Sequence, residues 1–143
     1  MDIPAMQLLV APEVESGVIL ARSDDEIATN IRSYTLAMDG DLLVGFCALH
    51  IHSPNLAEVR SMIIDSRYRG MNIGSTLVEK VCEEGRGLGL REVLALTYQK
   101  PFFERLGFIE IPKESIPEHK IWADCIKCKH FPICNEVSLI KTL

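Results

Sequence analysis

The sequence predicts one domain of mixed α and β structure, in which helices flank a mostly antiparallel sheet. The chain has 143 residues, of which 48% are hydrophobic, enough for a single substantial core. Segments with helical periodicity alternate with short apolar runs bounded by glycine or proline. Two of these runs meet at Asp39 and Gly40, a dipeptide that suits a tight hairpin turn and therefore antiparallel pairing.

The first half of the chain carries two helical patterns and three strand patterns. Asp2 can cap the first helix, and Pro4 is tolerated in its first turn. Met6, Leu9 and Val10 give this helix an apolar face. In order, the expected elements are a helix from residue 2 through 10, a helix over 24–33, and strands over 34–38, 42–50 and 58–64.

The second half begins with the longest helical pattern, which ends in a glycine-rich stretch. A later short helix opens at Pro101 and closes at Gly107. In order, the expected elements are a helix over 72–87, a strand over 92–97, a helix over 101–106, and strands over 108–111 and 136–141. Residues 112–135 hold three prolines and three of the five cysteines, so they are expected to form a cysteine-containing insertion.

The charge and the apolar pattern exclude several kinds of partner. A formal net charge of -5 argues against a broad basic surface for nucleic acid or anionic lipid, and favours a small-molecule substrate. No run approaches the roughly 18 apolar residues of a membrane span. The first residues lack the basic and apolar regions of a signal peptide, so a cytoplasmic location is expected. There the cysteines would be free thiols or metal ligands.

Residues 63–75 are the most informative stretch, because a strand runs through a glycine-containing turn straight into a helix. In that geometry, backbone N–H groups of the turn and of the first helical turn converge, and the helix dipole favours an anion there. A pyrophosphate group fits such a site. From the glycines alone, a plain connection between a strand and a helix remains an equal alternative.

These residues resemble the pyrophosphate-binding motif of the GNAT acetyltransferases, Q/R-x-x-G-x-G/A. Arg69 and Gly74 match the motif, as do the flanking Tyr68 and Gly70, while Asn72 replaces the middle glycine. Asparagine tolerates left-handed backbone better than other non-glycine residues, so the change is mild. Residues 102–108 resemble the family's aromatic-aromatic-x-x-x-Gly-Phe segment. The resemblance implies acetyl-CoA as co-substrate. It would be held by Met62, Ile63, Ile64, Arg69, Gly70, Met71, Asn72, Ile73, Gly74, Ser75, Phe102 and Phe103.

Further segments resemble the amino-acid acetyltransferases that make N-acetylglutamate. These are residues 17–23, residues 57–64, and residues 120–125 with Cys128, Cys134 and Glu136. The resemblance implies acetylation of the α-amine of an amino acid, glutamate first, at the start of arginine synthesis. The family fold normally opens with a strand, which is missing before the first helix here. Either the sheet has one strand fewer, or another chain covers that edge, as in a homodimer.

Amine acetylation requires a proton acceptor, and Glu58 matches the glutamate that many family members use as general base. Without the resemblance, an ordinary paired or solvated carboxylate would be the better interpretation. Regular alternation puts Glu58, Arg60, Met62 and Ile64 on one face. Arg60 can then hold a substrate carboxylate with its planar guanidinium. Arg22 and Lys100 are further substrate-binding candidates. For all three cations, a surface charge or a local ion pair is the open alternative.

The general acid is not assigned. Phe103 stands where the family often has a tyrosine, and Tyr98 is a substitute or a packing residue.

Cys125, Cys128 and Cys134, with His130, are chemically able to bind zinc. Their spacing is unusual, so packing is favoured and no metal is predicted. Cys47 and Cys82 are expected in the core. His50, His52 and His119 are expected as surface or hydrogen-bonded side chains.

Two other functions stay open. One is acetylation of a protein amine or a polyamine; the acidic net charge would attract a polyamine, but Arg60 and Arg22 would then have no carboxylate to bind. The other is a non-catalytic acyl-CoA-binding module with a regulatory role. Phe103 favours this second reading, and Glu58 counts against it.

Overall fold

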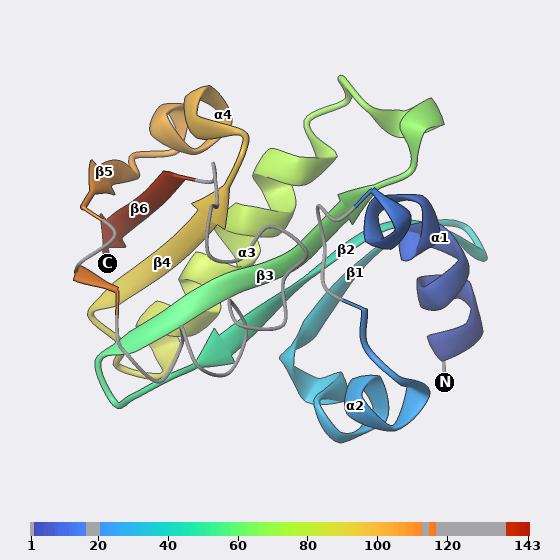
Figure 1. The fold of residues 1–143 in the computed structure, drawn as a ribbon, viewed down its shortest axis with the longest axis horizontal. Helices are drawn as coiled ribbons and strands as arrows, with labels where there is room; N and C mark the ends of the chain where they lie inside the picture. The colour runs from blue at the N-terminus through green and yellow to red at the C-terminus, as the bar shows by residue number, and fades with distance from the viewer. Residues whose placement is uncertain (1, 17–20, 113–114, 117–136) are drawn as a thin grey trace.

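The structure is a computed structural model that describes residues 2–16, 21–112, 115–116 and 137–143. These residues form one six-stranded sheet with helices on both faces (Figure 1). In chain order the elements are α1 (Ile3–Glu15), α2 (Asp24–Thr29), the 3₁₀ helix η1 (Ile31–Ser33), β1 (Tyr34–Asp39), β2 (Leu42–Ile51), β3 (Leu56–Ile64), the 3₁₀ helix η2 (Ser66–Tyr68), α3 (Ile73–Gly87), β4 (Glu92–Thr97), α4 (Lys100–Arg105), β5 (Ile109–Ile111) and β6 (Val137–Thr142).

The strand order in the sheet is β1-β2-β3-β4-β6-β5. Only β3 and β4 pair in parallel, and the other four pairings are antiparallel. The predicted mixed fold with a mostly antiparallel sheet is therefore confirmed. Gly40 has φ +61 in the turn between β1 and β2, the conformation that the sequence predicted for this hairpin.

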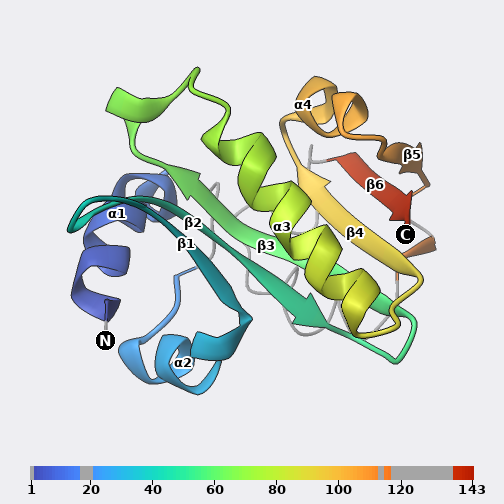
Figure 2. The same cartoon turned by 180° about the vertical axis from the view of Figure 1, so that it is seen from behind.

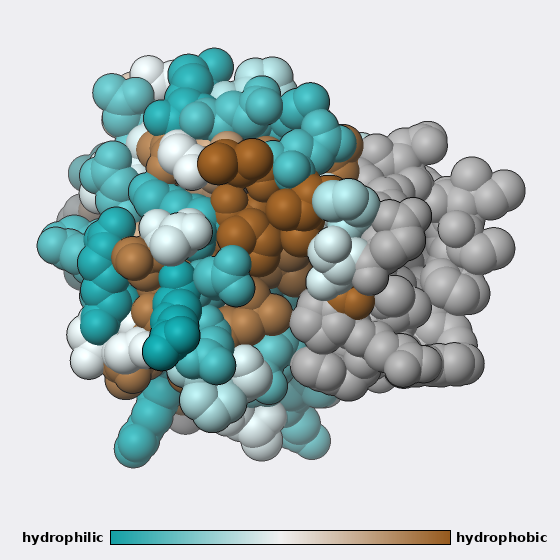
Figure 3. Space-filling model, turned by 90° about the vertical axis from the view of Figure 1, so that its left-hand side faces the viewer, coloured by the Kyte–Doolittle hydropathy of each residue, from teal (hydrophilic) through white to brown (hydrophobic). Residues whose placement is uncertain are grey.

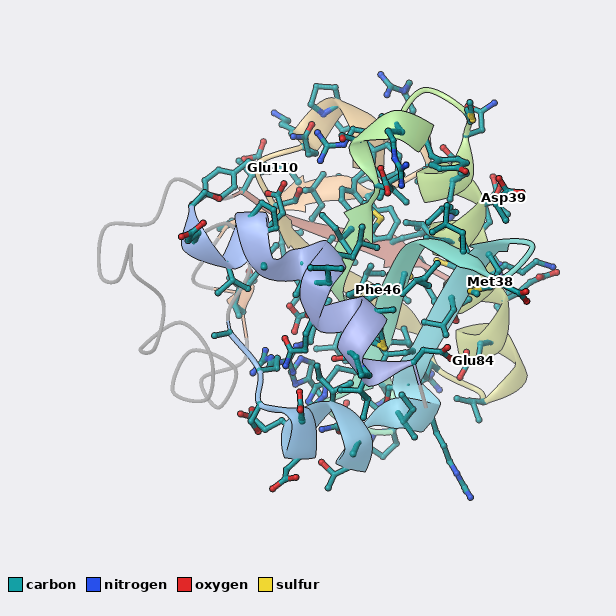
Figure 4. All side chains as sticks on the ribbon, turned by 90° about the vertical axis from the view of Figure 1, so that its right-hand side faces the viewer. Met38, Asp39, Phe46, Glu84 and Glu110 are labelled. Atoms are coloured by element: carbon teal, nitrogen blue, oxygen red, sulfur yellow. The ribbon has the colours of Figure 1, made fainter. Side chains whose placement is uncertain are left out.

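Helix α1 begins where predicted, and it covers one face of the sheet. Met6 is fully buried, and it belongs to a core cluster that also contains Val10 and Phe46. Figure 4 shows Phe46 on the side of the sheet that α1 covers. The expected cap is absent, because Asp2 has φ -85 and ψ 16 and its side chain makes no capping hydrogen bond. An N-cap needs a more extended backbone at that position.

Helix α2 is shorter than the predicted span of 24–33. It starts at a capping box, in which the hydroxyl of Ser23 accepts the Glu26 N–H and the Glu26 carboxylate accepts the Ser23 N–H. At its other end, the side-chain amide of Asn30 donates to the Glu26 carbonyl oxygen at 2.9 Å. This local bond competes with helix continuation, and a 3₁₀ turn follows.

Helix α3 covers the opposite face and supplies the main core (Figure 2). Leu77, Val78 and Val81 lie on its buried side, as the periodicity predicted. Cys47 and Cys82 are also buried there as free thiols, which confirms the prediction that they are core residues. Burial is the largest cause that raises the pKa of Cys47 to about 12, so this thiol stays protonated at neutral pH.

The two edges of the sheet are β1 and β5. Among the described residues no strand precedes α1, as the sequence predicted, so β1 has a strand partner on one side only. Figure 3 looks at the opposite edge, where apolar residues gather on the surface around β5 and β6. Ile109 of β5 is 71% exposed there.

Candidate functional site

The middle of the sheet opens between β3 and β4. Their pairing ends at Val59 and Ala95, although β3 continues for five more residues to Ile64. A β-bulge accompanies this divergence: Ser61 has φ +53, and two residues of β3, Ser61 and Met62, stand opposite Cys47 of β2. Figures 1 and 2 show the two strands separating toward their carboxyl ends, with the start of α3 beside the opening.

The bulge overturns the expectation that Glu58, Arg60, Met62 and Ile64 share one face. The extra residue shifts the alternation by one position, so Met62 and Ile64 pack with the α3 core. Ile63 instead belongs to the cluster beneath α1. Glu58 and Arg60 alternate with Ala57 and Val59, which lie in the α3 core, so both face the α1 side of the sheet.

The turn before α3 contains two residues with left-handed backbone. Gly70 has φ +85, and Asn72 has φ 61 and ψ 16, which confirms that asparagine takes the left-handed conformation here. Ile73, Gly74 and Ser75 follow as the first helical residues, whose N–H groups have no acceptor within a helix. These groups and the helix dipole favour a negatively charged ligand at the start of α3.

Gly74 also permits a close approach between three elements. A β-carbon at this position would lie 3.3 Å from Cζ of Phe102 and 3.9 Å from Cγ1 of Ile64. Thus Ile64 of β3, Gly74 of α3 and Phe102 of α4 meet beside the opening. Phe103 lies deeper, 3% exposed, with its ring edge-on to Phe102 and Phe108. As phenylalanine it offers no hydroxyl group.

Charged side chains surround this turn. Arg69 pairs with Glu13 of α1 at 3.5 Å, with 59% of its side chain exposed. Asp65 accepts hydrogen bonds from the Arg67 guanidinium, at 2.9 and 3.2 Å, and from its N–H at 3.0 Å. These bonds lower the pKa of Asp65 to about 2. Met71 is 62% exposed in the same turn.

A buried pair of ionisable groups lies on the α1 face. Nε2 of His52 is 2.9 Å from Oε1 of Glu58, and their side chains are only 4% and 3% exposed. Glu58 is therefore a paired carboxylate, and His52 is hydrogen-bonded, one of the two expectations for this histidine. The His50 ring stands edge-on to the His52 ring, with centroids 4.8 Å apart.

The charges of Arg22 and Arg60 both act on Tyr34. Tyr34 of β1 pairs with Ala48 of β2, and Ala48 pairs with Arg60 of β3, so Tyr34 and Arg60 lie in one row across three strands. Burial raises the pKa of Tyr34, while the charges of Arg22 and Arg60 act in the opposite direction. The backbone carbonyl of Arg22 accepts a hydrogen bond of 2.7 Å from the Gln7 side chain in α1.

Lys100 does not join these arginines among the described contacts. Its ammonium group lies 2.7 Å from Oε1 of Glu110, on edge strand β5. The hydrogen bond to Glu110 is the main cause that raises the pKa of Lys100. Lys100 therefore forms a local ion pair, which was one of its two interpretations. Arg22 also has a local partner, since its Nη1 lies 4.0 Å from Oε2 of Glu26. Tyr98 directly follows β4 and is 39% exposed.

The sequence predicts no metal at Cys125, Cys128 and Cys134. These cysteines lie outside the described residues, so this prediction stays open. Within the described part of the chain, no group of three or more His, Cys, Asp or Glu side chains is arranged to hold a metal ion. In the same part, no helix has the length and apolar character to cross a membrane.

The chain is similar to acetyltransferases over most of its length. The description "Acetyltransferase (GNAT) family" belongs to a family model that matches residues 7–108. An uncharacterized N-acetyltransferase of Chlorobaculum tepidum is 35% identical over 99% of this chain and 91% of its own length. The chain belongs to the GNAT acetyltransferase family. GNAT enzymes use acetyl-CoA as co-substrate, so the prediction of an acetyl-CoA-dependent N-acetyltransferase is confirmed.

Other GNAT relatives carry more specific names. An amino-acid acetyltransferase of Mycobacterium tuberculosis is 32% identical over 77% of this chain and 64% of its own length. N-acetylglutamate synthase from Neisseria gonorrhoeae, complexed with coenzyme A and N-acetyl-glutamate, has a TM-score of 0.88 at 22% identity. That likeness covers 99% of this chain but only 33% of the synthase, and it establishes the shared GNAT fold.

Sequence reasoning missed Tyr34 and the pairing of His52 with Glu58. Both depend on strand register: His50 stands opposite Glu58, and Tyr34 shares a row with Arg60. A signal was present, since His50 and His52 alternate at the end of one strand pattern just before Glu58 opens the next. To deduce which histidine meets Glu58, the length of the connecting turn must be known, and the sequence pattern does not determine that length.

Proposed function

We propose that this chain transfers the acetyl group of acetyl-CoA to the α-amine of an amino acid, with glutamate as the first candidate. One observation carries the proposal: Glu58 and Arg60 project from the same face of β3. The charge of Arg22 acts on Tyr34, which shares a row with Arg60 across three strands. Alternate residues of a strand are about 7 Å apart. Neighbouring groups are thereby suited to the amine and the carboxylate of one amino acid.

Glu58 is proposed as the proton acceptor, directly or through a water molecule. A neutral amine is required for attack, and a carboxylate in a buried setting can remove the proton from the ammonium form. Arg60 and Arg22 are proposed to bind carboxylate groups of the substrate, since guanidinium groups form paired hydrogen bonds with them. The names of the Mycobacterium and Neisseria relatives support an amino-acid substrate.

The opening between β3 and β4 is proposed as the acetyl-CoA site. When bound, acetyl-CoA supplies the acetyl group as a thioester. The N–H groups of Ile73, Gly74 and Ser75 are suited to its pyrophosphate. Residues 62–64 lie beyond the last pair with β4, so their backbone can line the opening. No general acid is proposed, because a thiol with a pKa near 8.5 leaves readily at neutral pH.

A screen of acceptors tests the proposal. The twenty amino acids, spermidine and a short peptide with a free N-terminus are each mixed with the protein and acetyl-CoA, and free thiol is followed. The highest kcat/KM is expected for glutamate or another amino acid with two carboxylates. Faster turnover of spermidine or of the peptide would exclude this substrate class. Binding of acetyl-CoA without turnover of any amine would instead indicate a non-catalytic module.

A further inference from the structure

His52, in the turn that follows β2, lies within hydrogen-bond distance of the Glu58 carboxylate. The bond joins Nε2 to Oε1 at 2.9 Å. Both side chains are more than nine-tenths buried. A buried carboxyl group loses its hydrogen bonds to water, which is costly unless protein groups replace them. The bond from His52 supplies one such replacement for Glu58.

The hairpin between β2 and β3 holds the imidazole in place. The N–H groups of His52 and Ser53 both donate to the Leu56 carbonyl oxygen, at 2.9 and 3.1 Å. The ring of His50 stands edge-on to that of His52, at a centroid distance of 4.8 Å. Backbone bonds on one side and a neighbouring ring on the other therefore restrict the orientation of His52.

We propose that His52 is a positioning residue for Glu58; this inference rests on the proposed role of Glu58 as the proton acceptor. In this arrangement the imidazole has a proton on Nε2, and that N–H donates a hydrogen bond to Oε1 of Glu58. The bond fixes the plane of the carboxylate relative to the sheet, and with it the direction in which Glu58 meets the amine. His52 acts through Glu58 and does not itself contact the substrate.

Two substitutions of His52 separate positioning from general support of the fold. His52→Leu removes the donor, whereas His52→Gln supplies an amide N–H with similar reach. With the acceptor turned over fastest in the screen, His52→Leu should lower kcat by up to about 10²-fold, the usual effect of a small misplacement of a reacting group. The KM for acetyl-CoA should not change. His52→Gln should recover most of the lost turnover.

A control variant tests whether any disturbance of the turn between β2 and β3 lowers kcat. Ser53→Ala removes the hydroxyl that accepts the Leu56 and Asn55 N–H groups, and it leaves the His52–Glu58 bond in place. It should retain wild-type kcat. If Ser53→Ala lowers kcat as much as His52→Leu does, or if His52→Gln is no better than His52→Leu, the positioning role is wrong.

A double variant separates this inference from the proposed function. If His52 acts through Glu58, adding His52→Leu to Glu58→Gln should cause no further loss of turnover. Multiplied losses in the double variant would overturn the positioning role. Full turnover by Glu58→Gln alone would overturn the role of Glu58 as base, and the inference with it. Reduced turnover by Glu58→Gln alongside normal turnover by His52→Leu would overturn only the inference.

The protonated nitrogen of His52 provides a readout that is independent of turnover. In protein labelled with ¹⁵N-histidine, the neutral His52 ring should carry its proton on Nε2, and this signal should shift in Glu58→Gln. A neutral ring protonated on Nδ1 would contradict the donor assignment, whatever the kinetics show.

Discussion

Gly74 is the residue that most directly tests the proposed acetyl-CoA site. Its missing β-carbon leaves room for the Phe102 ring, and the proposal places a ligand at the same helix start. A larger side chain has to displace one of them, while the helix itself tolerates it.

Gly74→Val should therefore abolish or strongly weaken acetyl-CoA binding without unfolding the protein. Calorimetric titration measures the affinity, and circular dichroism reports the fold. Gly87→Ala is the matched control, because it lies in the same helix and a β-carbon there meets nothing within 4 Å. Unchanged affinity in a folded Gly74→Val variant would remove the basis for placing acetyl-CoA at this turn.

Asp65 gives a prediction about the dependence of stability on pH. Its hydrogen bonds to Arg67 lower the pKa to about 2 in the folded protein, from an ordinary value of 3.8. A carboxyl group with a depressed folded-state pKa stabilises the fold above its unfolded pKa, and loses that effect as pH falls toward the folded value.

Arg67→Gln should accordingly lower the urea midpoint slightly at pH 7, and the difference from wild type should shrink between pH 4 and pH 2. The effect is small, because exposed ion pairs contribute little. Arg105→Gln, at the end of α4, serves as a control for loss of one positive charge. A difference that stays constant from pH 7 to pH 3 would show that Asp65 is not its source.

At the scale of elements, the bulge in β3 puts Glu58 and Arg60 on the α1 side of the sheet and Met62 and Ile64 on the α3 side. Ser61 is the extra residue, and its positive φ is uncommon for a residue with a β-carbon. Deleting Ser61 would place Met62 opposite Cys47 and keep Ile63 opposite Phe46. Every side chain would retain its present face, but the strand would lose the residue that bends it.

The deletion of Ser61 should therefore leave the protein folded and weaken acetyl-CoA binding, by about tenfold if one or two backbone contacts are lost. Ser61→Gly is the control, because glycine keeps the positive φ and the bulge. Calorimetric titration of both variants provides the comparison. Equal affinities for the deletion and the control would mean that the bulge does not create the site.

The sequence was sufficient to predict elements whose periodicity is regular. Strand β4 falls on the predicted residues, and α3 begins within one residue of its predicted start. The sequence was not sufficient where one extra residue shifts the alternation of side chains along a strand. A single bulge at Ser61 moved Met62 and Ile64 to the other face, and bulges have no strong sequence signature outside glycine.

The site was predictable to the same extent. The turn before α3 follows from local residues, so the left-handed backbone of Asn72 could be anticipated. The contacts of Lys100 and His52 depend on pairing between distant strands, and sequence patterns do not determine that register.

At the scale of the whole molecule, the proposed carboxylate site is assembled from segments far apart in the chain. Arg22 precedes α2, and Arg60 lies in β3. Gln7 of α1 holds the backbone of Arg22, and α1 itself is fixed by burial of Met6 against the sheet. The packing of α1 thereby determines whether the two guanidinium groups act on one substrate.

Substitution of the two arginines tests this arrangement. Arg60→Ala and Arg22→Ala should each raise the KM for glutamate roughly 10- to 100-fold, since a charge-assisted hydrogen bond contributes about 1.5–3 kcal/mol. The KM for acetyl-CoA should stay the same. Lys100→Ala is the matched control, because Lys100 pairs with Glu110 on β5, the edge strand opposite β1, and it should leave the KM for glutamate unchanged.

The double variant then reports how many carboxylates the site binds. If Arg22 and Arg60 bind two different carboxylates of glutamate, their effects on kcat/KM should multiply, and each single variant should discriminate less against alanine as the acceptor. If both bind the same carboxylate, the double variant should lose less than the product of the single losses. If neither single substitution changes the kinetics with glutamate, these arginines do not recognise the substrate, and an acceptor without a carboxylate becomes the better assignment.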